Sequence, residues 1–143
     1  MDAVDIDQAI EQFHEVANEF RKGNPEPLLK LWTQREDVSV ANPLGPAVRG
    51  WEKVAETVKR AASNYRDGEP VVFENVVKVV TPDLAFIVEN ERGRARVSGS
   101  QDLVPIALRA TTIFRKEDGI WKIVHRHADP IVSNQPVESL ILK

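Results

Sequence analysis

The sequence has 143 residues, the size of one ordinary domain. Its 19 Lys and Arg against 22 Asp and Glu give a net charge of −3, which argues against binding to nucleic-acid phosphates. The absence of cysteine excludes disulfides, thiolate zinc sites and cysteine nucleophiles. No apolar run approaches the ~20 residues of a membrane span, and the acidic N-terminus is unlike a secretory signal, so we expect a cytoplasmic protein without a membrane partner.

The first third of the chain predicts two helices and a strand. Between residues 3 and 20, apolar residues fall three or four positions apart and so share one helical face. Arg21 suits the negative end of that helix, and Gly23 suits its C-terminal cap. Asn24 can then cap a second short helix, and residues 38–41 have the composition of a strand.

The rest of the chain predicts a third helix and a meander of strands. The third helix begins near Trp51, and Tyr65 lies on its apolar face. Residues 92–103 indicate a loop, or a strand interrupted by one. The predicted strands span residues 71–80, 84–91, 106–115 and 120–129. This order predicts an α+β fold with helices covering one face of a curved sheet.

Residues 111–130, TTIFRKEDGIWKIVHRHADP, resemble the final hairpin of the SnoaL-like, nuclear-transport-factor-2-like superfamily. The loops NPLG at residues 42–45 and GNP at residues 23–25 also match that group. It includes ketosteroid isomerases, polyketide cyclases and the association domain of calcium/calmodulin-dependent kinase. The resemblance covers residues 6–130. It indicates the fold rather than the activity, because this fold carries many unrelated activities.

The resemblance implies a cone-shaped barrel of the cystatin-like type, with a curved antiparallel sheet wrapped around three N-terminal helices. It implies one SnoaL-like domain at residues 1–130, followed by a C-terminal tail at residues 131–143. It also implies a pocket for a small-molecule ligand and a homodimer formed through the sheet. We expect Ile113, Trp121 and Ile123 on the outer, dimer-forming face, since they are too apolar for open water.

Asn42 occupies the loop position at which ketosteroid isomerases carry the aspartate that abstracts a proton. An amide has no useful basicity near neutral pH. The isomerases' oxyanion-hole positions fall near Val16 and Thr112, and neither is a strong donor. The chain is therefore not a typical ketosteroid isomerase. Asn42 can either bind a ligand at the pocket mouth or cap the turn through its side chain.

The register of the last hairpin decides which side chains face the pocket. A turn at residues 117–119 pairs Lys116 with Ile120 and places Thr112 opposite Val124. By resemblance to the kinase association domain, the residues that alternate with His125 and His127 point inward. These are Val124, Arg126 and Ala128, beside Ala110 and Thr112.

On this register, Arg126 binds an anionic group in an otherwise apolar pocket, since a guanidinium is permanently charged. The alternative is an internal ion pair with Glu89 or Glu91. The candidate ligand-binding residues are Trp32, Asn42, Trp51, Thr112 and Arg126. Core packing is the alternative role of the two tryptophans.

His125, His127 and Asp129 alternate along one strand and so share a face. Imidazole and carboxylate could bind zinc or iron, but we favour a role at a dimer interface or barrel rim, and expect no metal and no cofactor. The sequence leaves His14, His125 and His127 as candidate general bases. Ser39 lacks the context of a nucleophile.

The leading functional hypothesis is a small-molecule-binding protein that acts by proton transfer, as a cofactor-independent isomerase, dehydratase or cyclase. The alternative is a non-catalytic module for ligand sensing or association. Loss of the usual base at Asn42 favours the alternative, and the unassigned histidines favour the enzyme.

Overall fold

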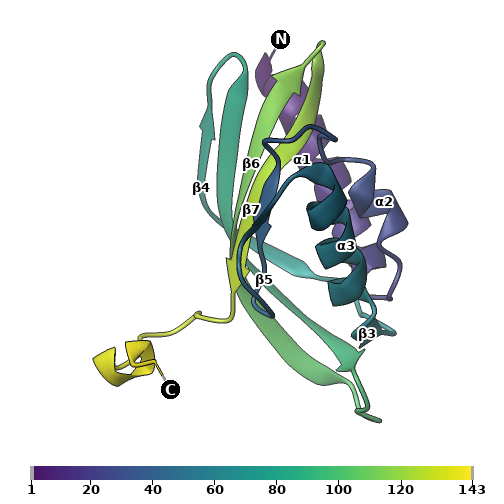
Figure 1. Cartoon of the computed structure of the whole chain (residues 1–143), viewed down its shortest axis with the longest axis vertical. Coiled ribbons are helices and arrows are strands. Elements are labelled where there is room, and N and C mark those ends of the chain that lie inside the picture. The colour runs from purple at the N-terminus through teal and green to yellow at the C-terminus, as the bar shows by residue number, and fades with distance from the viewer. Residues whose placement is uncertain (1, 143) are drawn as a thin grey trace.

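The computed structural model describes residues 2–142 (Figure 1). The helices are α1 (Asp2–Phe20), α2 (Glu26–Leu29) and α3 (Trp51–Ala62), and a short 3-10 turn, η1, spans Val137–Leu140. The strands are β1 (Ser39–Ala41), β2 (Val48–Arg49), β3 (Tyr65–Arg66), β4 (Val72–Val80), β5 (Leu84–Val97), β6 (Val104–Glu117) and β7 (Ile120–Asp129). The α+β fold predicted from the sequence is confirmed.

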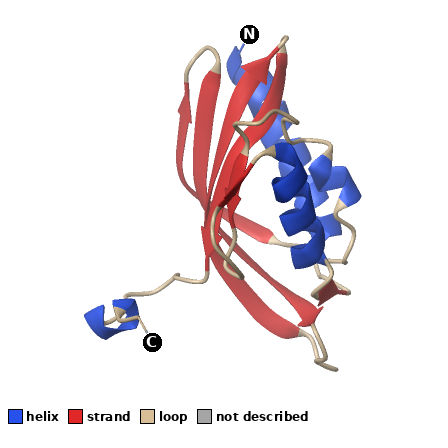
Figure 2. Cartoon of the chain, viewed as in Figure 1, coloured by secondary structure: helices blue, strands red, loops and turns tan. Residues whose placement is uncertain are grey.

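The strands form one curved sheet, and the three helices cover its concave face (Figure 2). The strand order is β2-β1-β7-β6-β5-β3, and β4 pairs with the first half of β5. The long strands β4 to β7 are antiparallel, as predicted. β1, however, runs parallel to β7 and pairs Val40 with Arg126, so the sheet is mixed.

The apolar stripe of α1 packs against the sheet. Ile6 and Phe13 are fully buried, and Phe20 packs against the edge of the same core. Gly23 closes the helix at a φ of 95°, with its N–H donating to the Phe20 carbonyl, as the sequence predicts. α1 therefore directs the residue that follows it, Arg21, toward the space between helices and sheet.

The third helix is shorter than predicted and ends at Ala62. Tyr65 does not lie on its face. It forms β3 with Arg66 and pairs with Val97 at the end of β5. β5 thus continues to Val97, through the first half of the segment 92–103. The sequence had allowed either a loop or an interrupted strand there.

The β6–β7 hairpin turns over two residues, not three. Asp118 and Gly119 both have positive φ, 52° and 81°, which suits a tight hairpin turn. Glu117 therefore pairs with Ile120, and the register predicted from a three-residue turn is wrong.

A bulge at Val124 changes the alternation along β7. Phe114 pairs with Ile123, but its neighbour Ile113 pairs with His125, so one extra residue stands on β7. Because side chains alternate between faces, this extra residue shifts their phase by one. Side chains on both sides of the bulge can therefore face the helices.

Because of the bulge, the outer face carries other side chains than the sequence predicted. Trp121 and Ile123 are 7% and 0% exposed and belong to the core, so the prediction that they lie outside is wrong. Beyond the bulge, Ala128 is buried on the helix side, and Arg126 points the same way, as predicted. Ile113 lies outside, since it pairs with His125 between two buried neighbours on β6.

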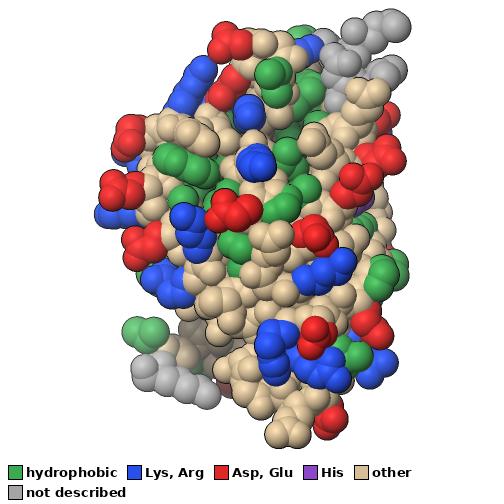
Figure 3. Space-filling model, turned by 90° about the vertical axis from the view of Figure 1, so that its right-hand side faces the viewer, with side chains coloured by type: hydrophobic (Ala, Val, Ile, Leu, Met, Phe, Trp, Pro, Cys, Tyr) green, Lys and Arg blue, Asp and Glu red, His purple; other side chains and the backbone are tan. Residues whose placement is uncertain are grey.

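After β7 the chain leaves the sheet and runs away from the body toward η1 (Figure 1). Val137, Leu140 and Leu142 on this tail are exposed. The face that carries the helices shows acidic, basic and apolar side chains interspersed (Figure 3). Within residues 2–142, no helix is long and apolar enough to cross a membrane.

Candidate functional site

A cavity lies between the concave face of the sheet and the C-terminal half of α1. The centre of a water-sized sphere can occupy about 70 Å³ of it, and the cavity is partly open to solvent. Its apolar walls include Phe13, Phe20, Leu28, Val58, Phe73 and Leu108. Its polar side chains are Arg21, Asn42, Tyr65, Glu91 and Arg126. A largely apolar enclosure with a few convergent polar groups is typical of a small-molecule site.

Arg126 on β7 and Glu91 on β5 form an ion pair across the sheet. Arg126 Nη2 donates to Glu91 Oε1 at 2.6 Å, and Nη1 donates to Thr112 Oγ1 at 3.1 Å. The guanidinium lies 5.3 Å from the centre of the Phe13 ring. The ion-pair alternative considered for Arg126 is therefore present, and Glu91 balances the charge that was expected to attract an anion.

Side-chain atoms of Glu91 itself and of Arg21 are buried in this cavity without a hydrogen-bond partner in residues 2–142. Glu91 Oε2 accepts no hydrogen bond there, and neither Nη1 nor Nη2 of Arg21 donates one. Arg21 is only 4% exposed. Burial lowers the pKa of its guanidinium, which the negative charge of Glu91 opposes. The side chain still stays protonated near neutral pH, so the cavity holds two positive groups and one negative group.

Tyr65 contributes a hydroxyl to the same cavity. Burial raises the pKa of this phenol, and the positive charges of Arg21 and Arg126 act in the opposite direction. Because the net shift is upward, the hydroxyl keeps its proton at neutral pH and can donate a hydrogen bond. The pairing of β3 with β5 holds Tyr65 in this position.

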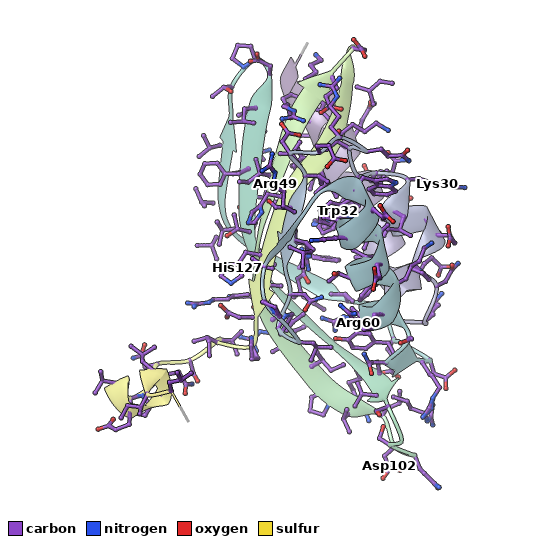
Figure 4. All side chains as sticks on the ribbon, in the orientation of Figure 1. Lys30, Trp32, Arg49, Arg60, Asp102 and His127 are labelled. Carbon is purple, nitrogen blue, oxygen red and sulfur yellow. The ribbon has the colours of Figure 1, made fainter. Side chains whose placement is uncertain are left out.

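Of the five ligand-binding candidates, Trp32, Asn42 and Arg126 line the cavity. Trp32 lies between the helices and the sheet (Figure 4), and its buried indole N–H has no partner within residues 2–142. Thr112 is buried behind Arg126 and accepts its hydrogen bond. Trp51 lines a separate hollow between α2 and α3.

The Asn42 side chain caps the turn that follows β1, since its Oδ1 accepts the Leu44 N–H at 2.9 Å. The residue also lines the cavity. Val16, near the expected oxyanion-hole position, packs against the hydrophobic core instead.

His14 does not line the cavity. Its Nε2 shares a hydrogen bond with Glu89 Oε1 at 2.8 Å, and its ring stacks on Phe73 at 3.8 Å between centres. This partly buried contact joins α1 to β4 and β5, so it helps to hold the helix on the sheet.

The histidines of β7 lie on the outer face. His127 projects on the side away from the helices (Figure 4), and His125 shares a 2.7 Å hydrogen bond with Ser39 on β1. Asp129 accepts from Arg109 Nε at 2.7 Å. Among residues 2–142, no three His, Asp or Glu side chains gather as a metal site.

Sequence reasoning missed Arg21 and Tyr65 and treated Glu91 only as a counter-ion. An arginine after a helix normally remains in solvent near the last carbonyls, so the sequence gives no reason to bury Arg21. One signal was available for Glu91. It alternates with Ile87 and Glu89 on β5, which places two ionisable groups on the face that buries Ile87.

The sequence model of the SnoaL-like domain matches residues 6–133. Comparison with curated proteins gives no significant match. The segment matched by the SnoaL-like domain is almost the same as residues 6–130, where the sequence resembles this superfamily, so the resemblance is confirmed.

Solved structures share the fold. A candidate dehydratase of the NTF2-like family from Streptomyces avermitilis is 25% identical, with a TM-score of 0.68 over 90% of this chain and 95% of that chain. A ketosteroid isomerase-like protein from Erwinia carotovora atroseptica is 19% identical, with a TM-score of 0.74 over 91% and 96%. A candidate calcium/calmodulin-dependent protein kinase type II association domain from Thiobacillus denitrificans is 19% identical, with a TM-score of 0.70 over 86% and 92%.

Proposed function

The chain belongs to the SnoaL-like domain family, and on that premise we propose that it binds a small organic molecule in the cavity and moves a proton on it. Glu91 is the group that takes and returns the proton. The observation that carries this proposal is the state of its carboxylate. Arg126 holds Oε1, while Oε2 lies buried in the cavity wall without a partner in residues 2–142.

A carboxylate in this setting can act as a general base. The ion pair with Arg126 fixes its orientation and leaves Oε2 as the oxygen that would accept a proton from a C–H or O–H group of the ligand. When a proton leaves a carbon next to a carbonyl, the electron pair moves to the carbonyl oxygen. The Tyr65 hydroxyl is a donor that can stabilise that oxygen. Return of the proton to another carbon completes an isomerisation, and departure of a hydroxyl group as water completes a dehydration.

The family relatives support the reaction class rather than a substrate. The S. avermitilis protein, 25% identical, is named as a candidate dehydratase. Asn42 cannot serve as the base, so ordinary steroid isomerisation is not expected here. Glu91 supplies a base from another strand of the same cavity.

Hydrogen–deuterium exchange tests this function directly. Small ketones and β-hydroxy carbonyl compounds are incubated with the protein in D₂O, and deuterium incorporation is followed by NMR. We expect protein-dependent exchange that falls about 10²–10⁴-fold in Glu91→Gln. Glu89→Gln is the matched control, because Glu89 is equally buried on β5 but pairs with His14 outside the cavity. Exchange that persists in Glu91→Gln contradicts the assignment.

A second candidate function is a non-catalytic association module, favoured by the outer face of the sheet. Val77 and Val79 on β4 are 37% and 39% exposed, and they pair with Val88 and Phe86 on β5. Together with Ile113 they form an apolar patch suited to a symmetric homodimer. Sedimentation tests this, with Val77→Lys and Val79→Lys expected to release monomer. A wild-type protein that is monomeric at micromolar concentration contradicts the dimer.

A further inference from the structure

We propose that the ligand of this cavity carries a carboxylate, and that Arg21 binds it. The inference rests on the proposed function only in assigning a ligand to the cavity, since the anchor and the proton-transfer group are different residues. It identifies a binding residue that the sequence did not indicate, and it specifies the charge of the ligand.

The first argument is the unsatisfied guanidinium. Arg21 is 96% buried, lines the cavity and leaves both terminal nitrogens without a partner in residues 2–142. A buried charge is costly unless it is paired, and buried polar groups in native structures are almost always hydrogen-bonded. The two terminal nitrogens match the two oxygens of a carboxylate, which is the geometry that guanidinium groups bind best.

The second argument is that two glycines lie against Arg21. A Cβ on Gly68 would lie 2.7 Å from both the Cβ and the carbonyl oxygen of Arg21, so Gly68 leaves space for the chain at this position. A Cβ on Gly93 would lie 3.1 Å from Arg21 Nη1, so a larger residue there would crowd the guanidinium. Gly93 therefore leaves the guanidinium the space that it occupies beside the cavity.

The third argument is the charge balance. Arg126 is satisfied by Glu91 and Thr112, so the excess positive charge of the cavity belongs to Arg21. One carboxylate brings the group of charges to zero. Tyr65 can add a hydrogen bond, and the apolar walls fit a hydrocarbon body rather than a second charged group. These features together select a small monocarboxylate with an apolar chain or ring.

Matched acids and amides test the proposal. Hexanoate and phenylacetate are compared with hexanamide and phenylacetamide by calorimetry and thermal shift. We expect the wild type to bind the acids at least about tenfold more tightly than the amides, as a charge-assisted contact requires. Arg21→Gln should abolish this preference, and Arg21→Lys should retain part of it. Arg92→Gln, which removes an exposed arginine paired with Glu74, should leave it unchanged.

The outcomes separate this inference from the proposed function. Glu91→Gln removes a negative charge near the anchor, so it should bind the acids as tightly as the wild type or more tightly while losing proton exchange. Equal binding of acids and amides by the wild type would overturn the proposal that the ligand carries a carboxylate. A preference that survives in Arg21→Gln but disappears in Arg126→Gln overturns Arg21 as the anchor. Should Arg21→Gln fail to fold by circular dichroism, Arg21→Met provides the same comparison.

Discussion

Near the β6–β7 turn, the concave face of the sheet presents Phe114, Trp121 and Ile123, which pack into an apolar core with Phe13. Toward the end of α1, the same face presents Glu91 and Arg126, and Arg21 reaches the same cavity from the turn after the helix. The first region gains free energy from apolar burial, while the second keeps the buried guanidinium of Arg21 without a hydrogen-bond partner in residues 2–142. A region that is poorly satisfied by its own chain is where a ligand has most to contribute.

The largest effect is expected in the apolar region. Phe114→Ala should lower the free energy of unfolding by about 3–5 kcal/mol, because it removes a fully buried ring and leaves a cavity. Urea denaturation measures the loss. Ile120→Ala, 58% exposed in the same hairpin, should change stability by less than about 0.5 kcal/mol. A loss in Phe114→Ala no greater than in Ile120→Ala would contradict the contrast between the regions.

A smaller loss is expected where a buried arginine has its partners. Thr112→Val keeps the shape of the side chain but removes the oxygen that accepts from Arg126 Nη1. The unfolding free energy should fall by about 1–2 kcal/mol, the cost of leaving a buried donor unsatisfied. Thr111→Val, its neighbour on the opposite face of β6, is the control and should be near neutral. Equal effects of the two changes would show that the hydrogen bond contributes little.

The opposite sign is expected for the arginine without partners. Arg21→Met keeps a long side chain and removes an unpaired buried charge, so it should raise the unfolding free energy by about 1 kcal/mol. The same variant should lose its preference for acids over amides. Thermal denaturation without ligand checks the first effect, with Arg92→Met as an exposed control. A clear destabilisation by Arg21→Met would mean that Arg21 stabilises the fold.

The smallest effect concerns His125 on the outer face. Burial lowers its pKa from the ordinary value, and the nearby His127 acts in the same direction. The unfolded chain therefore takes up this proton more readily, so the stability contributed by neutral His125 is present above about pH 6.5 and decreases as the pH falls. The difference in unfolding free energy between wild type and His125→Gln, measured from pH 5 to 8, should follow that direction. A difference that does not vary with pH contradicts it.

The helices and strands were largely predictable because their periodicity is local. The stripe on α1 follows from residue spacing alone, and the bounds of β7 agree with the prediction. The hairpin register was not predictable from spacing, because two-residue and three-residue turns fit the same Glu117-Asp118-Gly119 segment. No local sequence pattern predicts the bulge at Val124 either. The bulge determines which face of the sheet carries Trp121 and Ile123 relative to Arg126.

The cavity was predictable only in part. The inward direction of Arg126 came from the family resemblance, and its pairing with Glu91 was weighed as an alternative. Arg21 could not be assigned, because its guanidinium packs beside Gly93, which lies far from it in sequence. Tyr65 was placed on the wrong element, since the helix was expected to continue past Ala62. Contacts between residues far apart in the sequence produce no periodic pattern from which they could be predicted.

The extra residue in β7 also has an evolutionary consequence. Because Val124 is the extra residue, its deletion would leave a regular strand in which Ile123, Arg126 and Ala128 still face the helices. A one-residue deletion outside the bulge would instead exchange the inner and outer faces of one segment, and so transfer a side chain from the interior to the surface or in the reverse direction. Within one backbone plan, length changes in a strand offer a route to new pocket chemistry that point substitutions alone cannot take.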